Sequence, residues 1–404
     1  MKEPFVFTIP DQLRGEYVFQ TAGMFPPNGI VFGFNTVKKV GGFAKQLGGT
    51  QALLVTDEVM VRLGFADFVQ RAMEQEGLSV EVFGTVEPEP HLATADILWE
   101  RVRKKNFDLV VGLGGGSCLD MAKLVSLVAT NGQSPREVME KQQVTKAALK
   151  KILIPTTAGT GSQVSRTIVI SGGRDKYSFG TPLARAEIAL IDPGLTVSMP
   201  ARLTASTGID ALSHAIDSVM NRAANPLQDA LALGAIELIA KYLRRAVADG
   251  QDLEARYHMA LGSTMAMISG AGTLYSHSIA YALAMFQPLP HGIACGVPLP
   301  YTMAFNLPAI EDKLALVARA MGEPVESLSL PRAGERAVEL VYELMVDIKL
   351  PLSIRELGFK REDLPEMAEI CVTRYPKAGN PRPLSREDGL LLFQWLWEGK
   401  LPWL

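Results

Sequence analysis

The chain has 404 residues, of which 48% are hydrophobic and 21% are charged, and its formal net charge is −3. This composition is typical of a folded globular protein and excludes a largely disordered chain. The length exceeds what one ordinary compact core accommodates, so we expect two domains. The small net charge and the lack of a basic run give no reason to expect nucleic acid or an anionic membrane as a partner.

Three cysteines, Cys118, Cys295 and Cys371, stand far apart and form no C-x-x-C motif. They predict reduced thiols in a cytoplasmic protein rather than a disulfide framework or a zinc knuckle. The first residues include acidic and polar side chains too early for a signal peptide. The tract 257–310 lacks Asp, Glu, Lys and Arg, but Gly, Ser, Pro, Gln and His interrupt it. We therefore expect no membrane span there.

In the first half of the chain, short apolar runs alternate with amphipathic segments. Strands are predicted at 52–56, 79–83, 108–113, 151–155 and 189–193, and helices at 60–73, 93–105 and 119–128. This alternation predicts a parallel sheet covered on both faces. From about Pro200 onward, helical patterns rich in Ala, Leu and Met replace the strands, and 194–200 is the expected junction. The prediction is an α/β domain at 1–197 and an all-helical domain at 198–404.

A glycine-rich loop, from Gly112 to Ser117 (GLGGGS), lies between the predicted strand at 108–113 and the predicted helix at 119–128. Consecutive glycines let the backbone approach a diphosphate, which the amides at a helix N-terminus would bind. The dinucleotide fingerprint G-x-G-x-x-G fails, because Ser117 stands at its third glycine position. A tight strand-to-helix turn is therefore the alternative.

A second loop, from Pro155 to Ser162 (PTTAGTGS), follows the predicted strand at 151–155. Two such loops at neighbouring strand ends predict a ligand crevice at the carboxyl edge of the sheet. Asp57 comes at the end of another strand. Its carboxylate could bind the ribose of a nucleotide or cap the following helix.

His277 and His291 are two of the three histidines in the charge-free tract, and the third is His258. Buried polar groups without a partner cost free energy, so these rings need one. Asp210 and His214 are four residues apart in a helical pattern, which places both on one helix face. A divalent metal ion shared by all four side chains would satisfy them. Because this spacing alone is a weak pattern, a helix-start Asp and ordinary core histidines are the alternative.

Together, these segments resemble the iron-containing (group III) alcohol dehydrogenase family. The matching stretches follow in order at 114–120, 155–162, 192–200, 207–217 and 272–296, and they span almost the whole chain. The resemblance implies a Rossmann-like nucleotide-binding domain followed by a helical metal-binding domain, in the arrangement of dehydroquinate synthase. It also implies an active site between the two domains.

The resemblance also implies roles for single residues. It places the metal ligands at Asp210, His214, His277 and His291. It places the cofactor contacts at Asp57, Gly114, Gly115, Gly116, Ser117, Asp120, Thr156, Thr157, Thr160 and Lys176. A carboxylate at Asp57 would repel a 2′-phosphate, which favours NAD over NADP. The metal would be Fe²⁺ or Zn²⁺, since both accept such ligands.

The chain departs from the family pattern at three places. Tyr281 stands where many members have a histidine, four residues after the third ligand; it could relay a proton or shape the pocket. Gln163, directly after the second loop, stands where the family usually has a glutamate, so this chain has one negative charge fewer near the cofactor. Glu89-Pro90-His91 replaces Asn-Pro-Thr, so the asparagine expected at the cofactor is missing.

The implied reaction is reversible hydride transfer between NAD(H) and a small primary alcohol, aldehyde or diol, with the metal as a Lewis acid. A homodimer or larger homo-oligomer is implied as well. A glycerol dehydrogenase-like or other polyol or hydroxyacid dehydrogenase is the alternative on this scaffold. The charge-free tract disfavours a dehydroquinate synthase-like enzyme, and the complete ligand set disfavours a maleylacetate reductase-like one. A catalytically idle NAD-binding module is the alternative from another class.

Overall fold

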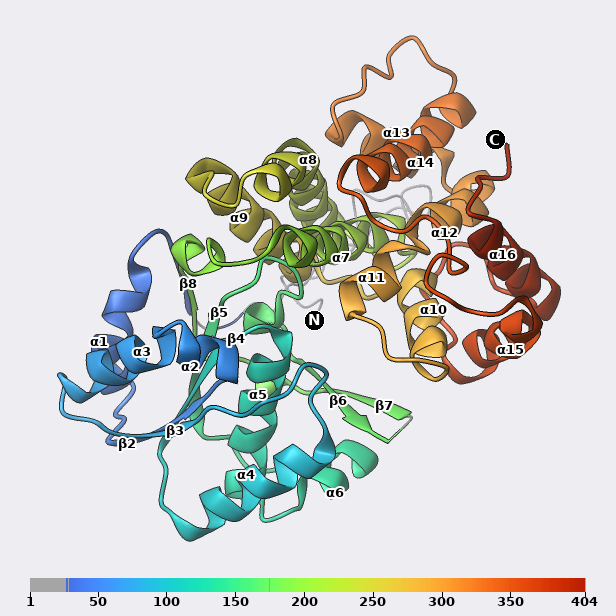
Figure 1. The fold of residues 1–404 in the computed structure, drawn as a ribbon. Helices are drawn as coiled ribbons and strands as arrows, with labels where there is room; N and C mark the ends of the chain where they lie inside the picture. The colour runs from blue at the N-terminus through green and yellow to red at the C-terminus, as the bar shows by residue number, and fades with distance from the viewer. Residues whose placement is uncertain (1–26, 28, 174, 404) are drawn as a thin grey trace, which may run out of the picture.

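A six-stranded parallel sheet forms the first half of the computed structural model, which describes residues 27, 29–173 and 175–403 (Figure 1). The strand order is β1-β8-β5-β4-β2-β3. The bounds are Gly29–Phe32 (β1), Gln51–Val55 (β2), Ser79–Phe83 (β3), Leu109–Gly114 (β4), Lys150–Pro155 (β5) and Ile188–Ile191 (β8). Five of these strands match predicted ones, and the short edge strand β1 was not predicted. The parallel sheet is confirmed.

Helices cover both faces of this sheet, as predicted. One face carries α1 (Val40–Gln46), α2 (Glu58–Arg62) and α3 (Phe65–Glu74), and the other carries α4 (Leu92–Lys104), α5 (Gly116–Asn131) and α6 (Pro135–Lys141). Successive residues of a strand point to opposite faces. Leu53 of β2 therefore packs into the core with α4 and α5, whereas Leu54 packs with α1 and α3. Both are fully buried, which explains the uninterrupted apolar runs.

Two details of the first half differ from the sequence prediction. The helix predicted at 60–73 is two helices, because Gly64 adopts a left-handed φ of 76° between α2 and α3. The apolar residues of 60–73 keep a helical spacing across Gly64, so the sequence pattern does not reveal the break. An antiparallel hairpin of β6 (Thr167–Gly172) and β7 (Asp175–Gly180) was not predicted. The hairpin follows the second glycine-rich loop and projects from the sheet (Figure 1).

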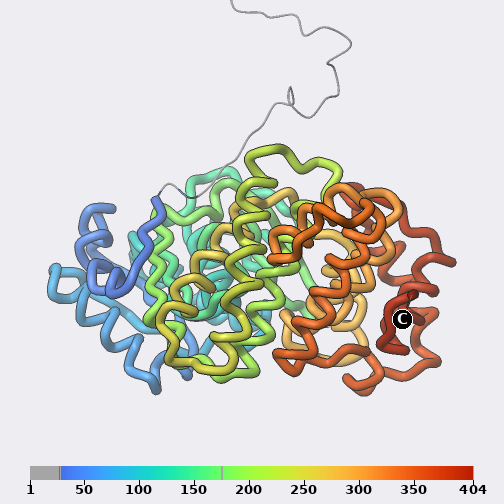
Figure 2. The backbone as a smooth tube through the Cα atoms, turned by 90° about the horizontal axis from the view of Figure 1, so that it is seen from above, coloured from blue at the N-terminus to red at the C-terminus, as the bar shows by residue number. Residues whose placement is uncertain are grey.

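The second half is helical throughout the described range 198–403, as predicted. Its helices are α7 (Ala201–Met220), α8 (Pro226–Ala248), α9 (Leu253–Ser269), α10 (Tyr275–Ala284), α11 (His291–Gly296), α12 (Leu299–Asn306), α13 (Glu311–Ala320), α14 (Leu330–Asp347), α15 (Leu364–Arg374) and α16 (Arg386–Glu398). Helices α7 to α9 lie between the sheet and the C-terminal helices (Figure 2). We propose the predicted domain boundary at 197 and 198, which falls between β8 and α7.

The charge-free tract 257–310 contributes to four of these helices, α9 to α12. None of the helices in the described residues is long and apolar enough to cross a membrane. The tract is short of charge because it packs inside the helical core, where Ile279, Cys295 and Val297 are fully buried.

A buried ion pair connects the first helix after the glycine loop with the second loop and the hairpin. The fully buried Lys123 donates to Asp120 at 3.1 Å, to the Ser162 hydroxyl at 2.7 Å and to the Thr167 carbonyl at 2.9 Å. The amide of Val169 donates to the other oxygen of Asp120 at 2.9 Å. Burial lowers the pKa of Lys123, and the carboxylate of Asp120 opposes this shift. The pair therefore fixes three segments that meet around the predicted nucleotide site.

Replacing Lys123 by Met should destabilise the protein by about 3 kcal/mol, because the Asp120 carboxylate would be left buried without its cation. Urea denaturation followed by circular dichroism would measure this loss. Adding Asp120→Asn to the Lys123→Met variant should restore part of the lost unfolding free energy. The control is Lys45→Met, which removes an exposed ion pair with Glu76 and should change the unfolding free energy by less than about 1 kcal/mol. Equal stability of Lys123→Met and wild type would contradict the role of the pair.

Candidate metal and nucleotide site

Helix α7 carries the first two predicted metal ligands on one face. Asp210 and His214 are one helical turn apart, and Oδ1 of Asp210 lies 4.0 Å from Nε2 of His214. Asp210 is only 1% exposed, and its Oδ1 has no hydrogen-bond partner among the described residues. An unpaired buried carboxylate oxygen is costly. This oxygen is therefore suited to bind a cation.

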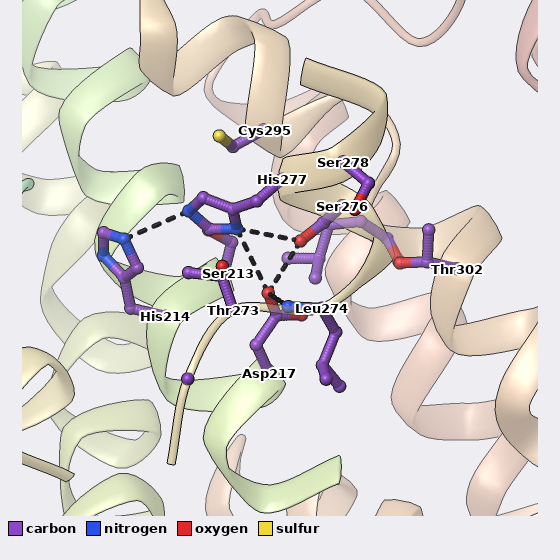
Figure 3. A network of polar contacts seen from close by, with 12 residues as sticks. Ser213, His214, Asp217, Thr273, Leu274, Ser276, His277, Ser278, Cys295 and Thr302 are labelled. Atoms are coloured by element: carbon purple, nitrogen blue, oxygen red, sulfur yellow. Dashed lines mark hydrogen bonds and ion pairs between the residues drawn. The ribbon is translucent and has the colours of Figure 1, made fainter. Parts of the chain in front are cut away.

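Helix α10 brings His277 to the same place (Figure 3). Its Nε2 lies 3.1 Å from Nε2 of His214, and its Nδ1 lies 3.1 Å from Oδ2 of Asp217. Asp217 also accepts hydrogen bonds from the Leu274 amide and the Ser276 hydroxyl, each at 2.8 Å. A carboxylate behind a histidine keeps the proton on Nδ1 and leaves the Nε2 lone pair for a metal.

Asp217 was not among the predicted site residues. It follows Asp210 by seven residues, which is two turns along the same face of α7, and this spacing could have identified it. Burial raises the pKa of Asp217 to about 6, while the hydrogen bonds from Leu274 and Ser276 oppose this shift.

Helix α11 begins with the remaining predicted ligand, His291. The next residue is glycine because the helices are in contact there: a Cβ on Gly292 would lie 2.0 Å from the carbonyl oxygen of Ser206. Asp210, His277, His291 and Cys295 each offer a ligand atom, and these atoms lie within 4.8 Å of one another. The structure thus brings three of the predicted ligands together with Cys295, which was not predicted, and the fourth, His214, lies against His277.

The donors fit a divalent metal ion. Nitrogen ligands about 2.0–2.1 Å from a tetrahedral zinc ion lie about 3.3 Å from each other, close to the 3.1 Å between Nε2 of His214 and Nε2 of His277. Burial lowers the pKa of His291 to about 3 and that of His277 well below its usual range. Both rings are therefore neutral at neutral pH, which is the form that binds metals.

The two predicted nucleotide loops contact each other at the carboxyl ends of β4 and β5. The amide of Thr156 donates to the Gly114 carbonyl at 3.0 Å. A Cβ on Gly116 would lie 2.8 Å from Cγ2 of Thr160, so only glycine permits this approach. Helix α5 starts at Gly116, and Gly115, Ser117 and Thr157 are partly exposed beside it. The backbone amides at this start remain our predicted diphosphate site.

Asp57 caps a helix and also lies beside the glycine loop. Its Oδ1 accepts from the Met60 amide at 2.8 Å, and its Oδ2 accepts from the Cys118 thiol at 3.4 Å. A Cβ on Gly114 would lie 3.4 Å from Oδ2. The cap that we weighed against ribose binding is therefore present, and the position is compatible with both roles. The ribose contact stays a prediction.

Two other predicted cofactor residues have protein partners. Asp120 accepts from Lys123, Ser162 and Val169, so the structure shows it as a support for the loops. Lys176 of β7 forms an ion pair with Glu89 at 3.3 Å. Glu89 is the residue that replaces the expected asparagine, and the replacement thus supplies a partner for this lysine. Direct contacts of Asp120 and Lys176 with a cofactor stay predictions.

Tyr281 of α10 lies one turn beyond His277 and borders the metal ligands. Its ring centroid is 6.3 Å from that of His291 and 5.3 Å from that of Tyr375, which follows α15. The Ser278 hydroxyl donates to the Tyr375 carbonyl at 2.6 Å and holds that segment in place. Burial raises the pKa of Tyr281, so its phenol stays protonated. Tyr375 was not predicted, because it is distant in sequence from every motif.

The second nucleotide loop also contacts the helices of the metal site. A Cβ on Gly159 would lie 2.6 Å from Cβ of Thr207, one turn before Asp210 on α7. A Cβ on Gly161 would lie 2.2 Å from Cβ of Met267 on α9. Gln163 adds a buried hydrogen bond to Thr264 of α9 at 3.3 Å. The predicted nucleotide and metal sites are therefore adjacent.

Comparison with known families agrees with this arrangement. Residues 27–193 match the family model described as iron-containing alcohol dehydrogenase, and residues 204–396 match that of its C-terminal region. The chain belongs to the iron-containing alcohol dehydrogenase family. This confirms the resemblance, the predicted fold class and the class of enzyme, a metal-dependent oxidoreductase. The assignment supports NAD and one divalent metal ion as cofactors.

Relatives of this dehydrogenase match over nearly their full length. Long-chain-alcohol dehydrogenase 1 of Geobacillus thermodenitrificans is 36% identical over 384 residues, which is 94% of this chain and 97% of the relative. The NAD-dependent methanol dehydrogenase of Bacillus methanolicus is 35% identical, over 90% of this chain and 97% of its own. A crystal structure of 1,3-propanediol oxidoreductase superposes with a TM-score of 0.90 at 34% identity, covering 94% of this chain and 100% of that one.

The contact between Asp217 and His277 predicts an effect on metal affinity. Asp217→Asn removes the charge that orients the ring, and it should weaken zinc binding about 10- to 100-fold. Equilibrium dialysis against zinc buffers followed by elemental analysis would measure the dissociation constant. Asp229→Asn is a suitable control, because Asp229 lies on α8 outside the donor set. Unchanged zinc affinity in Asp217→Asn would show that this carboxylate does not support the site.

Proposed function

We propose that this chain transfers a hydride reversibly between NAD(H) and a small primary alcohol, aldehyde or diol. The observation that carries the proposal is the contact of the nucleotide loop at Gly159 with the helix that bears Asp210 and His214. Hydride transfer requires the nicotinamide and the substrate carbon to lie side by side. A loop that binds the cofactor one turn from the metal ligands meets this requirement.

The roles of the protein groups follow from their surroundings. Asp210, His214, His277 and His291 would hold the metal, which when bound supplies Lewis-acid polarisation of the substrate oxygen. Asp217 keeps His277 in the tautomer that presents Nε2. Tyr281 borders the ligands with a protonated phenol, which can donate a hydrogen bond to a substrate oxygen. We propose it as a lining residue of the substrate pocket.

The nucleotide side follows from the loops after β2, β4 and β5. The amides from Gly114 to Ser117, at the start of α5, would bind the diphosphate. Thr156, Thr157 and Thr160 of the second loop would border the cofactor. The carboxylate of Asp57 would accept hydrogen bonds from a ribose and repel a 2′-phosphate, which supports NAD over NADP.

The substrate class is supported by relatives that are named for long-chain alcohols, methanol and 1,3-propanediol. Methanol and 1,3-propanediol are primary alcohols, and we propose the same group for the substrate of this chain. A cytoplasmic location is supported by three buried cysteines that form no disulfide in the structure. Membership in the family is our reason for proposing a homodimer or larger homo-oligomer.

Replacing His291 by Ala should remove bound metal and reduce turnover of butanal with NADH at least about 1000-fold, while NADH binding persists. Elemental analysis, steady-state kinetics and NADH fluorescence titration would measure the three quantities. The matched control is His258→Ala, because His258 stacks on Tyr242 away from the donors and should keep metal and activity. Full turnover by metal-free His291→Ala would overturn the proposed function.

The role of Asp57 in cofactor choice can be separated from its role as a helix cap. Asn caps helices as well as Asp, so Asp57→Asn should keep the cap of α2 while removing the negative charge. We expect kcat/KM with NADPH to rise at least about tenfold relative to NADH, because a like-charge contact costs several kcal/mol. An unchanged ratio at unchanged thermal stability would place the ribose elsewhere.

A further inference from the structure

We infer that Lys377 binds a negatively charged group of the substrate, so that this chain prefers a short alcohol or aldehyde that carries a carboxylate. The inference rests on the proposed function and narrows its substrate class. Lys377 follows α15 and extends toward the segment that leads into α10, where its Nζ donates to Oγ1 of Thr273 at 2.8 Å.

The partner of Lys377 belongs to the same segment as a proposed metal ligand. Thr273 lies four residues before His277, and the backbone amide that follows Thr273 donates to Oδ2 of Asp217 at 2.8 Å. Figure 3 shows Thr273 in the polar network around His277. Burial, His214 and the charge of Lys377, in this order, lower the pKa of His277. The ammonium of Lys377 is therefore within electrostatic range of the proposed ligands.

Lys377 and Thr273 lie on the accessible side of the proposed site. Both residues are partly exposed, and so are the proposed ligands His214 and His291. The supporting carboxylate of Asp217, in contrast, is fully buried. The partly exposed residues mark the side from which a substrate can reach the ligands, and Lys377 belongs to that side.

Three other lysines with largely buried side chains have a partner that Lys377 lacks. Lys123, Lys151 and Lys176 each form an ion pair with a carboxylate, at 3.1, 3.7 and 3.3 Å. Among the described residues, Lys377 forms no ion pair, and Thr273 is the one acceptor of its hydrogen bonds. Because an ammonium has three N–H donors, two of them remain for a ligand.

The protein compensates the charge of Lys377 only in part. Burial lowers the pKa of Lys377, and the charge of Asp217 opposes this shift from beyond ion-pair distance. Oδ2 of Asp217 already accepts hydrogen bonds from Ser276 and the backbone amide of Leu274 and lies 3.1 Å from Nδ1 of His277. A ligand that brings its own negative charge would complete the compensation.

One ammonium beside one hydroxyl suits a carboxylate. Oγ1 of Thr273 accepts from Lys377 and can donate its own proton to a ligand. The two oxygens of a carboxylate can accept from both groups at once. The tract 257–310, which carries Thr273 and two proposed ligands, contains no Lys or Arg to balance the second charge of a phosphate. We therefore expect a carboxylate rather than a phosphate.

Reduction of 4-oxobutanoate and of its uncharged methyl ester by NADH tests the inference on the metal-loaded, full-length protein. We expect wild type to prefer the acid at least about tenfold in kcat/KM, because the charge pair forms with the acid alone. Lys377→Met should lower kcat/KM for the acid about 10- to 100-fold, through KM, and change the ester less than about twofold, since the contact lies away from the reacting carbon. Lys377→Arg keeps the charge and should retain the preference.

The matched control is Lys241→Met, which changes the net charge equally, because Lys241 lies over the ring of Tyr242 on α8. The alternative role of Lys377 is to balance only Asp217, whose Oδ1 has no hydrogen-bond partner among the described residues. In that case Lys377→Met would lose zinc and would lose activity equally with acid and ester, which would overturn the inference. A preference for the acid that persists in folded Lys377→Met would overturn it as well.

The wild-type ratio and a second variant decide the matter if Lys377→Met does not fold. Thr273→Val keeps the shape of the side chain and should lower the preference for the acid about fivefold, because one hydrogen bond is lost. An unchanged preference in Thr273→Val, or equal kcat/KM for acid and ester in wild type, would overturn the inference and leave the proposed function intact. Wild-type protein that reduces neither these two aldehydes nor butanal would refute the proposed function itself.

Discussion

The proposed metal site is built around a buried carboxylate oxygen, Oδ1 of Asp210, which has no hydrogen-bond partner among the described residues. A cation bound beside it would compensate the cost of burying this charge. The tract 257–310 contains no charged residue that could supply the compensation internally. It supplies neutral imidazoles instead, and these donors would complete the proposed metal site.

Close packing of the helices brings the predicted metal ligands together. Helices α7 and α11 approach until glycine is the only residue that fits, since a Cβ on Gly292 or Gly296 would lie within 2.0–2.5 Å of α7 atoms. Asp217, on the far side of His277, fixes the orientation of that ring. The second nucleotide loop packs against α7 one turn before Asp210. The proposed metal and nucleotide sites are thereby held next to each other by close packing at glycine positions.

The parts of the fold that the sequence predicted are those with strong periodicity. Buried strands such as β4 are apolar at every position, because helices cover both faces of the sheet. The missed elements lack this signal. Strand β1 is a four-residue edge strand that is half-exposed, and the β6-β7 hairpin stands apart from the main sheet. The break at Gly64 was missed because a glycine within an apolar helical pattern does not reveal its φ.

By itself, the sequence determined the fold class and the positions of the two loops, because these depend on residue type and local spacing. Its resemblance to the family predicted the four Asp and His ligands. Tertiary structure decided what surrounds them. Asp217, Tyr375 and Cys295 join the site only because α7, α10, α11 and the end of α15 meet in space. Local sequence spacing carries no information on these tertiary contacts, because they are set by packing between segments far apart in the chain. The placement of the predicted ligands relative to one another is therefore a property of helix packing.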